Sequence, residues 1–149
     1  MKSDTKIARL TFIQDLRDLD FQNVDEDKVL NARYLSAYKK KLVVKTPRFV
    51  KRSASFGMLF ISNNERAGTD HGVNTVRHEY GHTRQLKRLG LPAYLAAIAM
   101  PSVRSNPDNP NYYSHPWEVT ADTEGGATRY HPPGAILNGA LYFRKYRRK

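Results

Sequence analysis

The segment from Asn74 to Gly90 constrains the fold more strongly than any other part of this 149-residue chain. Asn74 is a favourable N-cap residue and Gly90 a favourable helix terminator, so we expect a helix between them. Within it stands the pattern His78-Glu79-Tyr80-Gly81-His82. Four residues advance an α-helix by about 400°, which places the two imidazoles on one face, about one turn apart. Two nitrogens in this arrangement can reach a single Zn²⁺ ion, with Glu79 beside a water on the metal.

The chain has no cysteine, so any metal must be held by His, Asp or Glu. A zinc enzyme needs a third protein ligand and one position open to water. Glu118 and Asp122 lie four residues apart on a second expected helix. Glu118 can complete a His₂Glu site, and Asp122 can accept the ring N–H of one histidine. If Glu118 is only a carboxylate favoured at a helix start, the third ligand must be Asp122, His115 or Glu124.

Together these motifs, His-Glu-x-x-His followed by Glu-x-x-x-Asp, resemble the gluzincin clan of zinc metallopeptidases and its small single-lobe members, the minigluzincins. The likeness covers roughly residues 55–126. The run from Trp117 to Gly126 is also similar to short bacterial zincin domains, some of them attached to secreted toxins. The resemblance implies one zinc ion held by His78, His82 and Glu118, with Asp122 supporting a histidine. It implies hydrolysis of peptide bonds by a metal-activated water, with Glu79 as general base.

The chain departs from the thermolysin pattern in two ways. Thirty-five residues separate His82 from Glu118, so we expect the helix that begins at Pro92 to be an insertion on the core. We expect no second catalytic lobe after Gly126, which is a departure from the family in both the substrate cleft and the usual downstream donor to the oxyanion. Four residues are candidates for that role, of which Tyr113 and His115 rank first because they immediately precede the Glu118 helix: Tyr112, Tyr113, His115 and His131.

The remaining patterns predict an α+β, zincin-like single domain over residues 1–149. Helices are expected over residues 6–17, 27–40 and 93–99, and strands over 42–44 and 55–61, paired as a hairpin. We expect a small antiparallel sheet packed on the His78 helix, with the Glu118 helix opposite and strand 56–61 free to pair with an extended peptide substrate. Gly81 costs about 1 kcal/mol inside a helix. We therefore expect it to let another element approach closely.

The net charge of +11 is unevenly distributed. Residues 1–27, an acidic N-terminal segment, contain four basic and seven acidic residues, and residues 143–149 form a basic tail. The basic stretch over residues 39–52 has no accompanying nucleic-acid motif, so we expect a solvated face instead of specific nucleic-acid binding. The alternative function is a non-catalytic or latent zinc-binding module whose basic surface docks an acidic partner or nucleic acid.

No segment predicts insertion into a membrane. The longest apolar run, residues 91–100, is too short to span a bilayer, and residues 1–6 lack a hydrophobic signal core. We therefore expect a soluble protein, either cytoplasmic or delivered as part of a longer secreted chain, that acts on a peptide or protein substrate.

Overall fold

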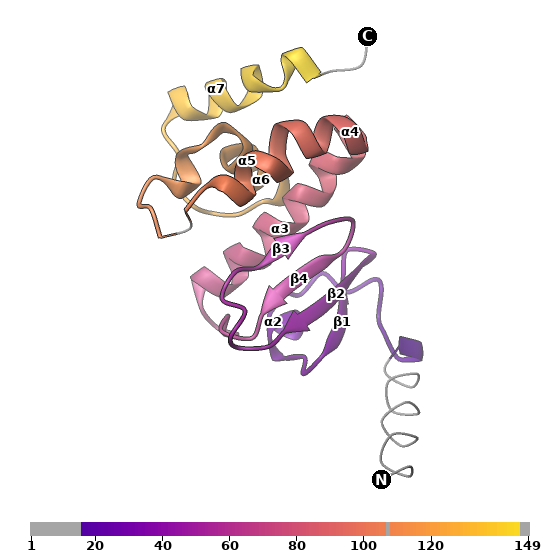
Figure 1. Cartoon of the computed structure of the whole chain (residues 1–149). Helices are drawn as coiled ribbons and strands as arrows, with labels where there is room; N and C mark the ends of the chain where they lie inside the picture. The colour runs from indigo at the N-terminus through magenta and orange to yellow at the C-terminus, as the bar shows by residue number, and fades with distance from the viewer. Residues whose placement is uncertain (1–15, 107, 147–149) are drawn as a thin grey trace.

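The computed structural model describes residues 16–106 and 108–146 (Figure 1). It confirms the α+β class. The elements follow one another as α2 (Glu26–Asn31), β1 (Leu35–Tyr38), β2 (Lys41–Thr46), β3 (Ala54–Ser55), β4 (Leu59–Ser62), α3 (Asp70–Leu89), α4 (Leu91–Tyr94), the π-helical turn η1 (Leu95–Ala99), α5 (Met100–Arg104), the 3₁₀ turn η2 (Tyr112–Ser114), α6 (Pro116–Gly125), α7 (Pro133–Tyr142) and the 3₁₀ turn η3 (Arg144–Tyr146).

The long helix α3 connects the two parts of the molecule (Figure 1). It packs against the sheet and α2, α6 crosses it near Gly81, α4 contacts its C-terminal end, and α7 packs on α6. Thr69 caps α3, since its hydroxyl accepts a hydrogen bond from the backbone N–H of Gly72 at 3.0 Å. The N-cap therefore lies five residues before the predicted cap at Asn74.

The sheet is mixed, which corrects the antiparallel arrangement expected from the sequence. Its strand order is β1-β2-β4-β3, and β2 pairs with β4 in parallel. The predicted hairpin between residues 42–44 and 55–61 is therefore wrong. Residues 47–53 instead cross to a short antiparallel pair, β3 with β4. Because β4 has a partner on each side, it cannot be the edge strand, and β3 occupies that position.

The helix expected over residues 27–40 is also wrong beyond Asn31. Residues 35–38 form β1, which pairs antiparallel with β2 through a two-residue turn at Lys39 and Lys40. Both lysines have positive φ, 45° and 69°. Such a turn normally carries Asn-Gly or a similar pair, so the sequence contained no turn signal here.

The other predicted helices have mixed outcomes. Helix 6–17 falls almost wholly outside the described residues, and so do parts of the acidic segment 1–27 and of the basic tail. The region predicted as helix 93–99 lies within the continuous run α4, η1 and α5. No helix in the part of the chain that the structure describes has the length and apolar character needed to cross a membrane.

Two apolar clusters hold these elements together. The first lies between the sheet, α2 and α3, and its fully buried members are Val29, Tyr38, Val43, Leu59, Ile61 and Val76. The second joins the end of α3 to the run α4, η1 and α5 (residues 91–104), which we call the inserted segment. Helices α6 and α7 and the turn η3 pack onto this cluster, and its buried members are Leu89, Tyr94, Ala97 and Ile98. The inserted segment is thus part of the core and lies directly over one end of α3.

Candidate metal centre

The crossing of α3 and α6 is unusually close because each helix places a glycine at the contact. A Cβ added to Gly81 would lie 2.7 Å from the carbonyl carbon of Ala121 and closer still to its oxygen. A Cβ on Gly125 would meet the carbonyl of Arg77 in the same way. The expectation that Gly81 admits a neighbouring element is confirmed, and this element is the helix that carries Glu118.

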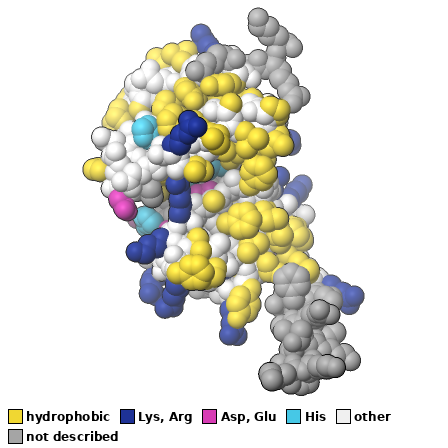
Figure 2. All heavy atoms as spheres, viewed as in Figure 1, with side chains coloured by type: hydrophobic (Ala, Val, Ile, Leu, Met, Phe, Trp, Pro, Cys, Tyr) yellow, Lys and Arg dark blue, Asp and Glu magenta, His cyan; other side chains and the backbone are white. Residues whose placement is uncertain are grey.

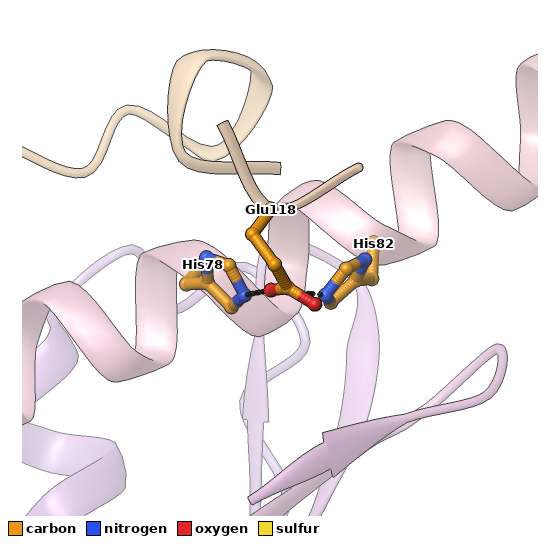
Figure 3. Close-up of side chains that lie close together, drawn as sticks. All are labelled: His78, His82 and Glu118. Atoms are coloured by element: carbon orange, nitrogen blue, oxygen red, sulfur yellow. Dashed lines mark ion pairs between the residues drawn. The ribbon is translucent and has the colours of Figure 1, made fainter. Parts of the chain in front are cut away.

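Three ligand-bearing side chains converge at this crossing. His78 and His82 project from α3, and Glu118 reaches between them from α6 (Figure 3). Glu118 Oε2 lies 2.6 Å from His78 Nε2 and 3.5 Å from His82 Nε2. One ligand atom from each residue lies within 4.8 Å of the others, and all three residues are buried. The described residues therefore form a cluster that could hold a metal ion.

Both imidazoles are oriented by acceptors at their far nitrogens. His78 Nδ1 lies 2.6 Å from Asp122 Oδ1, and His82 Nδ1 lies 2.7 Å from Gln85 Oε1. The Gln85 amide is itself anchored, since its Nε2 donates to Thr120 Oγ1 at 2.6 Å and to the Trp117 carbonyl at 3.0 Å. With Nδ1–H donated in each case, the Nε2 lone pairs are directed toward Glu118. This is the tautomer that metal-binding histidines adopt.

The histidine Nε2 atoms and Glu118 Oε2 lie so close together that a positive charge is needed between them. A neutral His78 of this tautomer would present a lone pair to Glu118 Oε2 at 2.6 Å, which is repulsive. Burial alone would lower the pKa of His78, but hydrogen bonds to Asp122 and Glu118 raise it to about 10. Burial would raise the pKa of Glu118, yet the two histidines hold it well below its usual range. A bound divalent metal in place of the extra proton would satisfy the same atoms, so the residues fit such an ion.

The second oxygen of Glu118 is held by the inserted segment. Ser102 Oγ, on α5, donates to Glu118 Oε1 at 2.8 Å. The Ser102 carbonyl in turn accepts a hydrogen bond from Arg52, whose guanidinium also donates to Tyr112 Oη at 2.9 Å. The inserted segment therefore holds Oε1 of the carboxylate, while Oε2 faces the histidines.

Glu79 lies where two cavities meet, beside the cluster. One cavity, of about 370 Å³, runs between β3 and the inserted helices and includes His82, Tyr94 and Ile98. The other, of about 160 Å³, contains His78 and Tyr113. Figure 2 shows acidic side-chain atoms in the hollow between the sheet and the helices above it. Burial raises the pKa of Glu79, although the nearby histidines oppose that shift.

The structure separates the two residues ranked first as oxyanion donors. The ring centroid of Tyr113 lies 5.4 Å from that of His78, and Tyr113 lines the smaller cavity. His115 instead precedes α6 as its N-cap and stacks on Trp117, with ring centroids 4.7 Å apart. His115 lines neither cavity that contains Glu79.

Sequence reasoning missed several residues that complete the site. Gln85 stands three positions after His82 on the same helix, so an i, i+3 search for acceptors would have found it. Ser102 and Arg52 had no local signal, because they reach the site only through tertiary packing. His131, considered only as an oxyanion donor, lies 2.7 Å from Asp122 Oδ2. That contact makes it a further support for the carboxylate that orients His78.

Searches of protein families, of curated proteins and of solved structures find no match to this chain. The likeness to gluzincins therefore depends on the motif residues alone. The geometry supports the coarser statement that His78, His82 and Glu118 form a site able to bind a metal ion.

Proposed function

We propose that this protein is a zinc-dependent peptidase that hydrolyses peptide bonds with Glu79 as general base. The observation that carries the proposal is the convergence of three oriented ligands beside a buried carboxylate that lines two cavities. A purely structural zinc site is normally closed by four protein ligands. Here the described residues supply three, as catalytic zinc sites do.

The donor set suits a single zinc ion. Two imidazole nitrogens and one carboxylate oxygen are ligands that Zn²⁺ accepts in hydrolytic enzymes. When bound, zinc supplies Lewis acidity, which polarises a carbonyl group and acidifies water. His78, His82 and Glu118 would hold the ion, while Asp122 and Gln85 keep the imidazoles in the binding tautomer. Such supporting contacts commonly contribute 10- to 100-fold in metal affinity or activity, as orders of magnitude.

Glu79 would move the proton. Its carboxylate is buried, with Oε2 lacking a hydrogen-bond partner among the described residues, so it is available to a water molecule in the cleft. A pKa raised by burial brings this base closer to neutrality, where proton transfer is most effective. Glu79 would take a proton from the attacking water and deliver it to the leaving nitrogen. General acid–base catalysis of this kind contributes about 10²–10⁴-fold.

Donors for the developing charge on the carbonyl oxygen line the same cavity. Arg52, Tyr112 and Tyr113 all face the smaller cavity together with Glu79. Burial raises the pKa of Tyr113, so its hydroxyl remains protonated at neutral pH and can donate a hydrogen bond. From the sequence, Tyr113 and His115 ranked first as donors to the oxyanion. We retain Tyr113 for this role.

The substrate would lie in the larger cavity as an extended chain. Its lower wall is the edge strand β3 with the flanking residues 52–56, and its upper wall is the inserted segment. An edge strand offers unpaired backbone groups to a peptide, and the resulting affinity depends little on the peptide's sequence. The inserted segment thus supplies the wall that a second lobe supplies in thermolysin-like enzymes.

Metal content and hydrolysis measured on matched variants test the proposal. We expect one equivalent of zinc in the wild type and in Glu79→Gln, and loss of zinc in His78→Ala. Peptide hydrolysis should fall at least about 100-fold in Glu79→Gln and should also stop on chelation. Arg66→Gln, a change at an exposed residue that belongs neither to the cluster nor to the two cavities, is the control. Full activity in Glu79→Gln would contradict the assigned base, and no zinc in the wild type would contradict the site.

A further inference from the structure

A further cavity lies on the face of α3 that points away from the histidines. It measures about 530 Å³ and combines the β1–β2 turn with the C-terminal half of α3. At 100° per residue, Tyr80, Arg84 and Lys87 point about 140–180° away from the mean direction of His78 and His82. Six of its eight lining residues are cationic, and none is acidic: Lys39, Lys40, Lys41, Arg84, Lys87 and Arg88, with Tyr80 and Thr83.

We infer that this cavity is a binding site for a compact ligand carrying several clustered phosphate groups. Its volume falls in the range of small-molecule sites, about 300–1,000 Å³. A concave wall with cations on two sides concentrates positive potential and favours a small polyanion that several side chains can contact at once. The site lies outside the proposed peptidase centre and does not depend on that function.

Most of these cations are not neutralised within the described chain. Arg88 pairs with Glu124, and the charge of Glu124 also acts on Arg84. In the part of the chain that the structure covers, Lys40, Lys41 and Lys87 have no carboxylate within ion-pair distance. Lys87 and Arg88 are favoured in any case by the helix dipole, since they occupy the last turn of α3. The dipole does not account for the three lysines on the hairpin.

The hairpin turn provides an independent indication. Lys39 and Lys40 both adopt positive φ, a conformation that costs an L-residue other than Gly, Asn or Asp roughly 1–2 kcal/mol. The turn is held by backbone bonds from Lys39 N to the Asn23 carbonyl and from Lys40 N to the Phe21 carbonyl. Strain of this kind is commonly retained where it serves a ligand site. Here it places two lysines at the mouth of a cationic cavity.

Two aromatic rings lie close to the Lys39 ammonium group. The Lys39 ammonium lies 5.0 Å from the Tyr80 ring centroid and 5.3 Å from that of Tyr38. These cation–π contacts hold the flexible lysine over the cavity and not out in solvent. Tyr80 belongs to α3 and Tyr38 to β1, so the two walls are joined by the same ammonium group.

Calorimetric titration of the full chain with inositol hexakisphosphate at about 150 mM salt tests the inference. Arg84→Glu/Lys87→Glu should weaken binding at least about tenfold. Arg48→Glu/Arg66→Glu, which makes the same charge change at exposed positions outside the cavity, should leave binding within about twofold. Equal losses in both double variants, or no binding by the wild type, would overturn the site.

Two further measurements separate the competing explanations. Lys39→Asn/Lys40→Gly should keep or raise the free energy of unfolding, since it relieves the turn, while weakening inositol hexakisphosphate binding at least about fivefold. Unchanged binding in this variant would overturn the role of the turn lysines. If vesicles containing a phosphoinositide bisphosphate bind through the same residues, the phosphate groups that the cavity binds belong to a lipid headgroup. Displacement by duplex DNA with an affinity that grows with DNA length would replace the inference with nucleic-acid binding.

Discussion

Replacing Gly81 by alanine tests whether the close approach of α3 and α6 assembles the metal centre. A Cβ at this position would lie 2.7 Å from the Ala121 carbonyl carbon and closer to its oxygen. Carbon atoms in ordinary contact are about 3.5–4.0 Å apart. Both neighbours are helical backbone, so neither can rotate out of the way. The helices must therefore separate by about 1 Å at the crossing.

That separation has two measurable consequences. Overpacking in a core typically costs 1–3 kcal/mol or more, and the better helix propensity of alanine offsets about 1 kcal/mol of it. We expect the free energy of unfolding to fall by about 2 kcal/mol. Glu118 lies on the displaced helix, three residues before Ala121. Metal–ligand distances tolerate only about 0.2 Å, so a shift of 1 Å should remove most of the zinc affinity.

Guanidinium unfolding followed by circular dichroism, together with zinc measured per mole of protein, checks both effects. Gly134→Ala is the matched control, because a Cβ there meets nothing within 4 Å and the residue also lies in a helix. The free energy of unfolding of Gly134→Ala should equal that of the wild type or lie slightly above it, and this variant should retain its metal. If Gly81→Ala unfolded at the wild-type denaturant concentration and still bound one zinc, the packing argument would be refuted.

Three further outcomes follow from the same contacts. Ser102→Ala removes the donor to Glu118 Oε1 and should lower zinc affinity by about 10- to 100-fold without altering the circular dichroism spectrum. Zinc at about 100 times its dissociation constant should stabilise the wild type by about 2.7 kcal/mol in thermal unfolding, and His78→Ala should show no such gain. Burial would raise the pKa of Glu26, but hydrogen bonds from Arg77 and Tyr38 lower it. The free energy of unfolding of Glu26→Gln should therefore be about 1 kcal/mol below that of the wild type at pH 7. This difference should shrink as the pH falls below about 4.5 and through the folded-state pKa of Glu26, which urea titrations of both proteins would measure.

The candidate ligands were predictable because helical periodicity is a local property. Spacings of four residues place His78 next to His82, and Glu118 next to Asp122, whatever else the chain does. The candidate metal site itself required one further assumption, namely that the two helices face each other. Gly81 was the sequence signal for that contact, and the structure shows its counterpart, Gly125, on the opposite helix.

The sheet was predicted less well, since strand pairing depends on distant residues. The pattern of residues 27–40 suited a helix, but a hairpin with residues 41–44 buries Ala37 and Tyr38 against the core. The sequence did not predict that hairpin, because Lys39 and Lys40 are not residue types usually found in a two-residue turn. The parallel pairing of β2 with β4 joins segments separated by a crossover, which no local pattern records.

The sequence by itself determined which atoms can bind a metal, because side-chain chemistry and helical spacing are properties of short segments. Only the tertiary structure decided how these atoms are held and what surrounds them. Ser102 and Arg52 come from segments outside both motifs, and packing alone brings Ser102 to Glu118 and Arg52 to Ser102. The cationic cavity arises in the same way, since the hairpin lysines and the α3 cations lie more than forty positions apart in the chain and meet only where the hairpin lies against α3.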